Sequence, residues 1–169
     1  MGPDVPAIRL ATADDSERLF AWRNDPDTRR ASHNTDVVPP ERHAEWFEKS
    51  LQRNDRILLI AMLHEEPIGT VRFDKRPESY LEVSINIAPE ARANKLGAAC
   101  LGAACDFILT KKSAGFHAEI RSENAASIRI FQRCGFHETG RKGGFLVFRR
   151  DPDQQPGAVP GSSSETVDV

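Results

Sequence analysis

The sequence predicts a single α/β domain, and three observations lead to this prediction. The 169 residues suffice for one domain with a proper core and are too few for two ordinary ones. The hydrophobic pattern switches repeatedly between the alternation typical of strands and the spacing typical of helices. The resulting order of elements, βααβββαβαββ, contains no internal repeat, so we expect one compact unit rather than an array.

Local patterns place these elements along the chain. Apolar residues that alternate or form short runs predict strands, and helically spaced apolar residues between capping signals predict helices. The expected elements are a strand at 8–11, a helix at 16–24, a helix from 40 to about 51, strands at 57–63, 68–73 and 81–88, a helix at 95–110, a strand at 116–121, a helix at 124–134, and strands at 136–141 and 145–149.

The ends of the elements have their own signals. Residues 12–15 supply capping side chains for the first helix, and Pro26 closes it because proline cannot continue a helix. The pair Pro39-Pro40 suits the start of the second helix. Residues 64–67 and 142–144 predict hairpin turns between the flanking strands.

Composition excludes several classes of protein. A net charge of −2 gives no overall basic field for nucleic acid. No apolar run is long enough for a transmembrane helix, and the N-terminus lacks the features of a signal peptide. Cys100, Cys105 and Cys134 lie in helical patterns without CxxC spacing. We therefore expect core thiols in a reducing cytoplasm, and no metal.

Domain boundaries follow changes in composition. The predicted domain spans residues 8–150, after a flexible N-terminus over 1–7. From Asp151 onward Pro, Gln, Gly and Ser dominate, with almost no large apolar residue. Such a segment cannot bury enough surface to offset its ordering entropy, which predicts a disordered tail over 151–169.

Two segments point to chemistry. Residues 85–99 form an apolar strand, a turn and a polar loop that enters an Ala- and Leu-rich helix. A helix N-terminus offers unpaired N–H groups and partial positive charge, which suit a phosphate. Residues 123–136 form a helix stopped by Gly135, with Asn124 and Ser127 three residues apart on one face.

Together these segments resemble the GNAT superfamily of acetyl-CoA-dependent N-acetyltransferases. In that family the first loop carries Gln/Arg-x-x-Gly-x-Gly/Ala, and here Arg92 and Gly97 fill the outer positions. Lys95 replaces the middle glycine, and a positive φ at this residue would make a lysine costly. The second segment matches Asn-x-x-Ser-x-x-x-aromatic-x-x-x-Gly-Phe. The resemblance covers residues 8–149 and implies a twisted mixed sheet with helices on both faces and splayed fourth and fifth strands.

The resemblance also implies that acetyl-CoA is the acetyl donor and that its pantetheine arm enters between the splayed strands. It places coenzyme contacts at Ile85, Asn86, Ile87, Arg92, Ala93, Asn94, Lys95, Leu96, Gly97, Ala98, Asn124, Ser127 and Phe131. Structural alternatives stay open for three of these. Asn124 suits an N-cap, Ser127 a solvent-facing helix position and Gly97 a packing glycine inside a helix.

Acetyl transfer to an amine requires a group that takes a proton from the amine. Glu82 is the first candidate, because many family members place a glutamate near this point of the strand. Glu119 and His43 are the other candidates for a catalytic role. Each also has a structural interpretation: an ion pair for Glu82, a contact to a neighbouring helix for Glu119, and a helix-surface position for His43. Phe131 stands where many relatives have a tyrosine acid, so we expect water or no dedicated acid.

Residues 21–32 and 41–47 resemble the branch that N-acetylates nucleotide-linked deoxysugars in pathways of the pseudaminic-acid type. The resemblance implies a small-molecule amine as acceptor, a nucleotide sugar, with substrate contacts at Arg23, Asn24, Arg29, Arg30 and Trp46. The arginines suit a diphosphate, although surface charges and a core tryptophan would need no ligand.

Three alternatives to a nucleotide sugar remain. A protein N-terminal acetyltransferase of the ribosomal-protein alanine type shares much of this series. An aminoglycoside acetyltransferase would prefer an acidic cleft for its cationic substrate. Lys95 and Phe131 keep open an inactive module that only binds acyl-CoA. A monomer or homodimer is expected in each case.

Overall fold

The computed structural model describes residues 4–152, so residues 1–3 of the predicted flexible N-terminus and residues 153–169 of the predicted tail lie outside the described residues. The elements, in chain order, are β1 (Ala7–Leu10), the 3₁₀ turn η1 (Ala13–Asp15), α1 (Ser16–Asn24), α2 (Pro26–Ala31), α3 (Pro40–Gln52), β2 (Arg56–Leu63), β3 (Glu66–Lys75), β4 (Tyr80–Ile87), the 3₁₀ turn η2 (Pro89–Asn94), α4 (Gly97–Leu109), β5 (Gly115–Arg121), α5 (Ala125–Arg133), β6 (His137–Lys142) and β7 (Phe145–Arg150).

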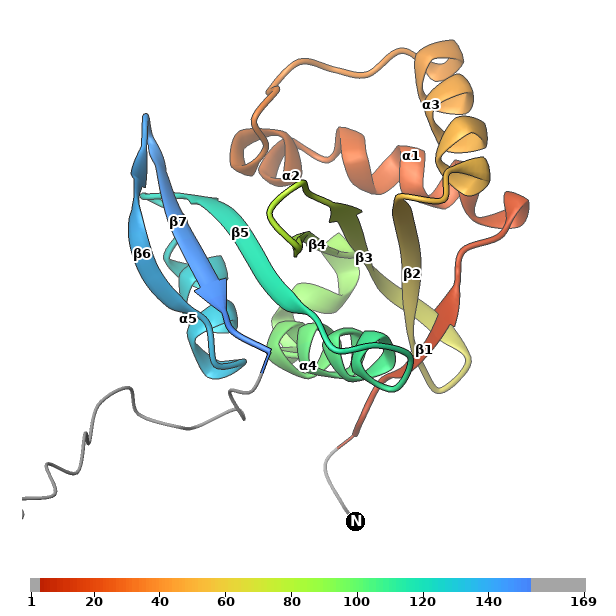
Figure 1. Ribbon diagram of the computed structural model, residues 1–169. Coiled ribbons are helices and arrows are strands. Elements are labelled where there is room, and N and C mark those ends of the chain that lie inside the picture. Colours follow the sequence, from red (N-terminus) through yellow and green to blue (C-terminus); the bar gives the residue numbers. More distant parts are fainter. Residues whose placement is uncertain (1–3, 153–169) are drawn as a thin grey trace, which may run out of the picture.

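The seven strands form one mixed sheet in the order β1-β2-β3-β4-β5-β7-β6 (Figure 1). Neighbouring strands are antiparallel except β4 and β5, which are parallel. Parallel strands need a crossover connection, and α4 supplies it. The predicted α/β class and mixed sheet are thus confirmed.

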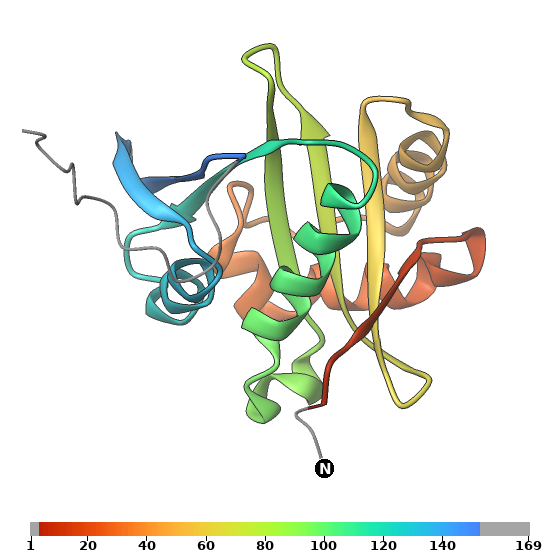
Figure 2. The same cartoon turned by 60° about the horizontal axis from the view of Figure 1, so that its bottom comes forward.

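Helices cover both faces of the sheet. Figure 2 shows α4 across one face, with α5 beside it, while α1, α2 and α3 lie behind the strands. The α4 face buries a core that includes Phe73, Phe116 and Phe148. A second core joins Leu19, Trp22 and Phe47 of the N-terminal helices to the opposite face. No helix in residues 4–152 is long and apolar enough to cross a membrane.

The structure corrects the prediction at Pro26. The expected end of the first helix is found at Asn24, but Pro26 then begins α2, which the sequence pattern did not reveal. Proline is tolerated in the first turn because its missing N–H would have no partner there. The side chain of Asp25 caps the new helix by accepting a hydrogen bond from the Thr28 amide at 3.0 Å.

The cysteines occupy the core, as expected. Cys100, Cys105 and Cys134 are free and buried. Burial raises the pKa of their thiols to about 11, 12 and 11 respectively, so they are unreactive at neutral pH.

The sheet opens between its two parallel strands. The ladder between β4 and β5 contains only the pairs Tyr80–Gly115, Leu81–Phe116 and Glu82–His117. Beyond these pairs β4 stays on β3 and β5 stays on β7, so the two strands separate toward their C-terminal ends (Figure 1). This opening, called the split below, is the predicted splay of the fourth and fifth strands.

Candidate active site

The split is bordered by polar side chains on the side of the N-terminal helices. Residues paired across a sheet point to the same face, so Glu82 on β4 and His117 on β5 share one face at the last rung before the split. Alternation then places Asn86 on β4, and Glu119 and Arg121 on β5, on this same face. We call it the acceptor face, because the sequence places the expected amine substrate on the side of the N-terminal helices.

Helix α2 bridges the split. The Thr28 hydroxyl donates to Oδ1 of Asn86 on β4 at 3.0 Å. Just past the C-terminal end of α2, the Ser32 carbonyl accepts hydrogen bonds of 3.1 and 2.7 Å from Arg121 on β5. One short helix therefore joins both halves of the sheet beyond the point where their own pairing stops.

Glu119 lies on β5 past the last β4–β5 pair, with its side chain 15% exposed. Three cationic or titratable groups face its carboxylate: His33 Nε2 at 3.4 Å, Lys142 Nζ at 3.6 Å and His117 Nε2 at 3.7 Å. Glu119 therefore contacts a cluster of basic side chains, whereas the structural interpretation from the sequence expected a contact to a neighbouring helix. Two imidazoles and one ammonium group thus gather around this carboxylate on the face of the split.

Glu82 has a different environment. Its carboxylate accepts hydrogen bonds from the guanidinium of Arg76 on the β3–β4 connection, and its side chain is 18% exposed. This is the ion-paired strand residue that the sequence left open as an alternative. The Arg76 guanidinium therefore occupies the Glu82 carboxylate within the chain.

The structure does not bring His43 to the split. Only 4% of this residue is exposed, and its ring packs between Phe20 of α1 and Phe47 of α3. Nε2 lies 2.9 Å from the Ser16 carbonyl oxygen. Burial lowers the pKa of His43, outweighing this hydrogen bond. The predicted surface position is therefore wrong, because His43 packs in the interface between α1 and α3, and its catalytic role stays a prediction without support from this position.

The loop before α4 leaves a helix N-terminus open. Leu96 precedes the helix without a side-chain cap, and the first turn of α4 has no acidic residue. The first N–H groups of the helix thus have no partner within it and carry partial positive charge. Ala93, Asn94 and Lys95 are exposed beside this terminus, while Leu96 and Ala98 are half-buried. These features fit the pyrophosphate of a coenzyme.

Lys95 has the positive φ that is costly for a lysine. Its φ of 55° and ψ of 33° are left-handed, where a non-glycine residue costs about 1–2 kcal/mol. Gly97 lacks a side chain for a packing reason, because a Cβ there would lie 2.4 Å from Cδ1 of Ile130 on α5. The packing alternative for Gly97 therefore has direct support.

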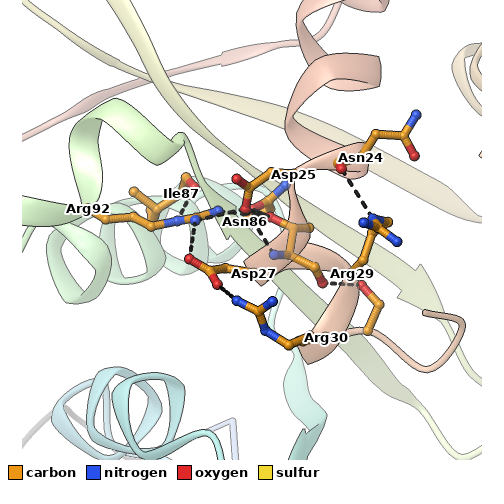
Figure 3. Close-up of polar contacts among 10 residues, drawn as sticks. Asn24, Asp25, Asp27, Arg29, Arg30, Asn86, Ile87 and Arg92 are labelled. Atoms are coloured by element: carbon orange, nitrogen blue, oxygen red, sulfur yellow. Dashed lines mark hydrogen bonds and ion pairs between the residues drawn. The ribbon is translucent and has the colours of Figure 1, made fainter. Parts of the chain in front are cut away.

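Arg92 makes its side-chain contacts within the chain. As Figure 3 shows, it reaches from η2 to the start of α2. Its guanidinium donates to Asp25 at 2.8 Å, to the Thr28 hydroxyl at 2.8 Å and to the Ile87 carbonyl at 3.2 Å. These partners take the place of the phosphate that the sequence suggested for the Arg92 side chain.

The residues of α5 that the sequence predicted as coenzyme contacts have partners within the chain. Asn124 is the N-cap: its Oδ1 accepts from the Ser127 amide at 3.2 Å, and its Nδ2 donates to the Ser127 hydroxyl at 3.1 Å. Phe131 is 3% exposed and packs edge-on against Phe136. The structure thus gives these residues local roles, and their coenzyme contacts stay predictions.

The predicted substrate residues largely hold the loop between α2 and α3. Arg23 donates to the Asn34 carbonyl at 2.8 Å, and Arg29 donates to the Thr35 carbonyl at 3.3 Å. Asn24 exchanges hydrogen bonds of 2.9 and 2.8 Å with the backbone of Val38.

Two further substrate candidates have partners elsewhere in the chain. Arg30 is exposed and forms an ion pair with Asp27 (Figure 3). The ring of Trp46 lies 5.4 Å from the guanidinium of Arg56 and packs on the second core. Trp46 therefore has the structural role that the sequence left open.

A positive cluster nevertheless remains on the acceptor side. Burial lowers the pKa of Arg23, as do the positive charges of Arg29 and Arg72. Arg72 lies on β3, opposite Ser84 of β4. Nη1 of Arg23 is buried and has no hydrogen-bond partner among the described residues. Like charges gathered with an unused donor suit an anionic group.

Sequence reasoning missed His33, His117, Arg72 and Arg76. Strand alternation was sufficient to place His117 on the face of Glu119. No local pattern identifies His33, because it lies in a loop whose position depends on β5 and β7.

A mixed sheet that splits beside an uncapped helix N-terminus is the arrangement implied by the resemblance to acetyl-CoA-dependent N-acetyltransferases. The family model described as "Acetyltransferase (GNAT) domain" matches residues 7–137. The chain therefore belongs to the GNAT acetyltransferase family and is an acetyl-CoA-dependent N-acetyltransferase. No sequence among curated proteins matches the chain significantly.

Solved structures of acetyltransferases resemble the chain. A ribosomal-protein-alanine N-acetyltransferase from Brucella melitensis is 26% identical, with a TM-score of 0.71 over 86% of this chain and 99% of that one. Spermidine N-acetyltransferase from Vibrio cholerae, in complex with CoA and spermine, is 17% identical, with a TM-score of 0.75 over 86% and 93%. An aminoglycoside acetyltransferase in complex with coenzyme A and kanamycin is 17% identical, with a TM-score of 0.72 over 85% and 92%. The last two show similarity of fold alone.

Proposed function

We propose that this N-acetyltransferase acts on the primary amine of a small acceptor that also carries a negative charge, a nucleotide-linked amino sugar. The observation that carries this proposal is the cluster of Arg23, Arg29 and Arg72 on the acceptor side. Arg23 and Arg29 use part of their donors to hold the α2–α3 loop, and Arg72 pairs with Asp74 at 2.8 Å, while Arg23 Nη1 keeps a donor unused. A diphosphate provides acceptors for such groups.

The coenzyme side of the proposal rests on the split and on α4. In an antiparallel ladder, successive residues of β4 direct their backbone groups alternately toward β3 and away from it. From Val83 to Ile87 the groups directed away lack a partner strand, because β5 has diverged. An amide-bearing pantetheine arm supplies partners for them. The open N-terminus of α4 then receives the pyrophosphate.

When bound, acetyl-CoA supplies an activated acetyl group, so the protein must hold the amine, remove its proton and stabilise negative charge on the thioester oxygen. An unpaired main-chain amide of Ile85, Asn86 or Ile87 suits the last task. For the proton we propose Glu119, since the imidazoles of His33 and His117 lie 3.4 and 3.7 Å from its carboxylate, and imidazole is a common proton-transfer group. Glu82, held by Arg76, maintains the shape of the split at its closed end.

A protein N-terminal amine is the second candidate acceptor. The relative from Brucella melitensis, named as a ribosomal-protein-alanine N-acetyltransferase, supports it at 26% identity over nearly all of that chain. Aminoglycosides and polyamines are polycations, and the cluster of Arg23, Arg29 and Arg72 opposes their binding by charge repulsion.

One assay separates these acceptors. CoA release is measured with UDP-linked amino sugars, with peptides that begin with alanine or serine, and with aminoglycosides. Nucleotide sugars should be the best acceptors, and uridine diphosphate should compete with them but not with acetyl-CoA. Efficient acetylation of the peptides without competition by uridine diphosphate would favour the second candidate.

A further inference from the structure

The loop between α2 and α3 brings a histidine to Glu119. The imidazole of His33 stacks on the ring of Phe145, with centroids 3.9 Å apart and an interplanar angle of 10°. The preceding residue, Ser32, is held through its carbonyl by Arg121, whose guanidinium also lies 4.8 Å from the Phe145 ring. The position of His33 is therefore fixed by contacts to β5 and β7.

His33 differs from the other groups that face Glu119. Its side chain is 59% exposed, whereas that of His117 is 17% exposed. The third group, Lys142 at the end of β6, carries an ammonium group, which donates hydrogen bonds and has no acceptor atom. His33 is thus the imidazole that joins the half-buried carboxylate to bulk water.

We infer that His33 positions Glu119 and conducts its proton to solvent, an inference that rests on the function proposed above. An acceptor that binds as an ammonium group loses two protons on acetylation: one ends on the departing CoA thiolate, which leaves as the thiol, and one must reach solvent. Glu119 takes this proton from the amine and passes it from Oε2 to Nε2 of His33, 3.4 Å away. His33 then releases a proton from Nδ1 to water. Proton exchange with water moves the remaining ring proton from Nε2 back to Nδ1, so a carboxylate and an imidazole with a free Nε2 are ready for the next cycle. An imidazole suits this relay because its ordinary pKa, about 6.5, is near neutrality.

Two substitutions at His33 separate the relay from simple packing. His33→Phe keeps a ring to stack on Phe145 but cannot carry a proton, and His33→Ala leaves space for free imidazole. Both should lower kcat by about tenfold or more while the KM for acetyl-CoA stays unchanged. Added imidazole should restore activity to His33→Ala and not to His33→Phe. His64→Asn, at an exposed histidine on the β2–β3 turn, is the matched control and should behave like wild type.

The assay is first performed on the wild-type chain with the acceptor panel. If no amine is acetylated, the proposed function fails and this inference with it. If the wild type is active and His33→Phe retains its kcat, His33 is only a stacking anchor and the inference alone is overturned. An active wild type with no effect of imidazole on His33→Ala would overturn the inference equally.

Discussion

Arg92 Nη1 lies 2.8 Å from Oδ2 of Asp25, and this contact fastens the loop before α4 to the first residue before α2. The same guanidinium donates to the Thr28 hydroxyl, which in turn donates to Asn86 on β4. The proposed coenzyme loop and the helix that bridges the split are thus one connected network. A substitution at Arg92 should therefore also disturb the position of α2 on the acceptor face.

This contact makes a prediction about pH. Burial alone would raise the pKa of Asp25, but hydrogen bonds from the Thr28 amide and from Arg92 outweigh it and lower that pKa. A lowered pKa stabilises the folded state above the unfolded pKa of about 3.9, and this contribution is lost as the pH falls through the folded value. Chemical unfolding between pH 7 and pH 3 should therefore show a smaller loss of stability in Asp25→Asn than in wild type. An equal loss in both proteins would contradict the prediction.

Gly97 and Ile130 should couple energetically. Gly97→Ala places a methyl group 2.4 Å from Cδ1 of Ile130, so the Ile130 side chain or the two helices must move, at a cost of about 1–3 kcal/mol. Ile130→Val removes that Cδ1 and should recover part of the loss in the double variant. The free energies of unfolding of the two single variants and the double variant measure the coupling. If the free-energy changes of the two single variants simply add up in the double variant, the Gly97–Ile130 contact is not the cause of the loss in Gly97→Ala.

Replacing Lys95 by glycine should stabilise the protein. Lys95→Gly removes the penalty of the left-handed backbone and should raise the free energy of unfolding by up to about 1 kcal/mol, since the freer unfolded glycine offsets part of the gain. The KM for acetyl-CoA should not rise if the loop amides, rather than the lysine charge, hold the pyrophosphate. Lys95→Ala is the matched control, because it removes the charge and retains the strained conformation. A weaker coenzyme interaction in both variants would assign the binding to the ammonium group.

Arg72 should determine the choice of acceptor. Arg72→Gln removes one charge of the cluster formed with Arg23 and Arg29, so the KM for a nucleotide sugar should rise by about tenfold. The KM for acetyl-CoA should stay the same. Rising salt should weaken inhibition by uridine diphosphate in the wild type, because exposed charges are screened. An equal rise of both KM values would show a structural defect rather than a loss of acceptor binding.

Most of the fold was predictable because it depends on local patterns. Alternation identified β4 and β5, and the Ala-rich run identified α4 to within two residues of its start. Helix α2 was missed because Pro26 stops one helix and begins another, and only the cap by Asp25 decides which. At this position the sequence signal is one proline, which can either end a helix or begin one.

The site was less predictable because its side chains have distant partners. Arg92 beside a small-residue loop suggests a phosphate, and nothing nearby indicates that Asp25 occupies its guanidinium. His43 looks like a surface residue until α1 packs over it. Glu119 was identified by its strand, whereas His33 was not, since its contact with Glu119 depends on the path of a loop.

The most direct test of the account is the rate of acetyl-CoA-dependent CoA release by the wild type, Glu119→Gln and Glu82→Gln with the best acceptor of the panel. We expect Glu119→Gln to lower kcat by roughly 10²-fold or more, with an unchanged KM for acetyl-CoA, because the proton acceptor at the split is lost. Glu82→Gln should lower kcat less and mainly reduce stability, since it leaves Arg76 without its carboxylate. Full activity of Glu119→Gln, or a loss found only in Glu82→Gln, would contradict the placement of the chemistry at Glu119.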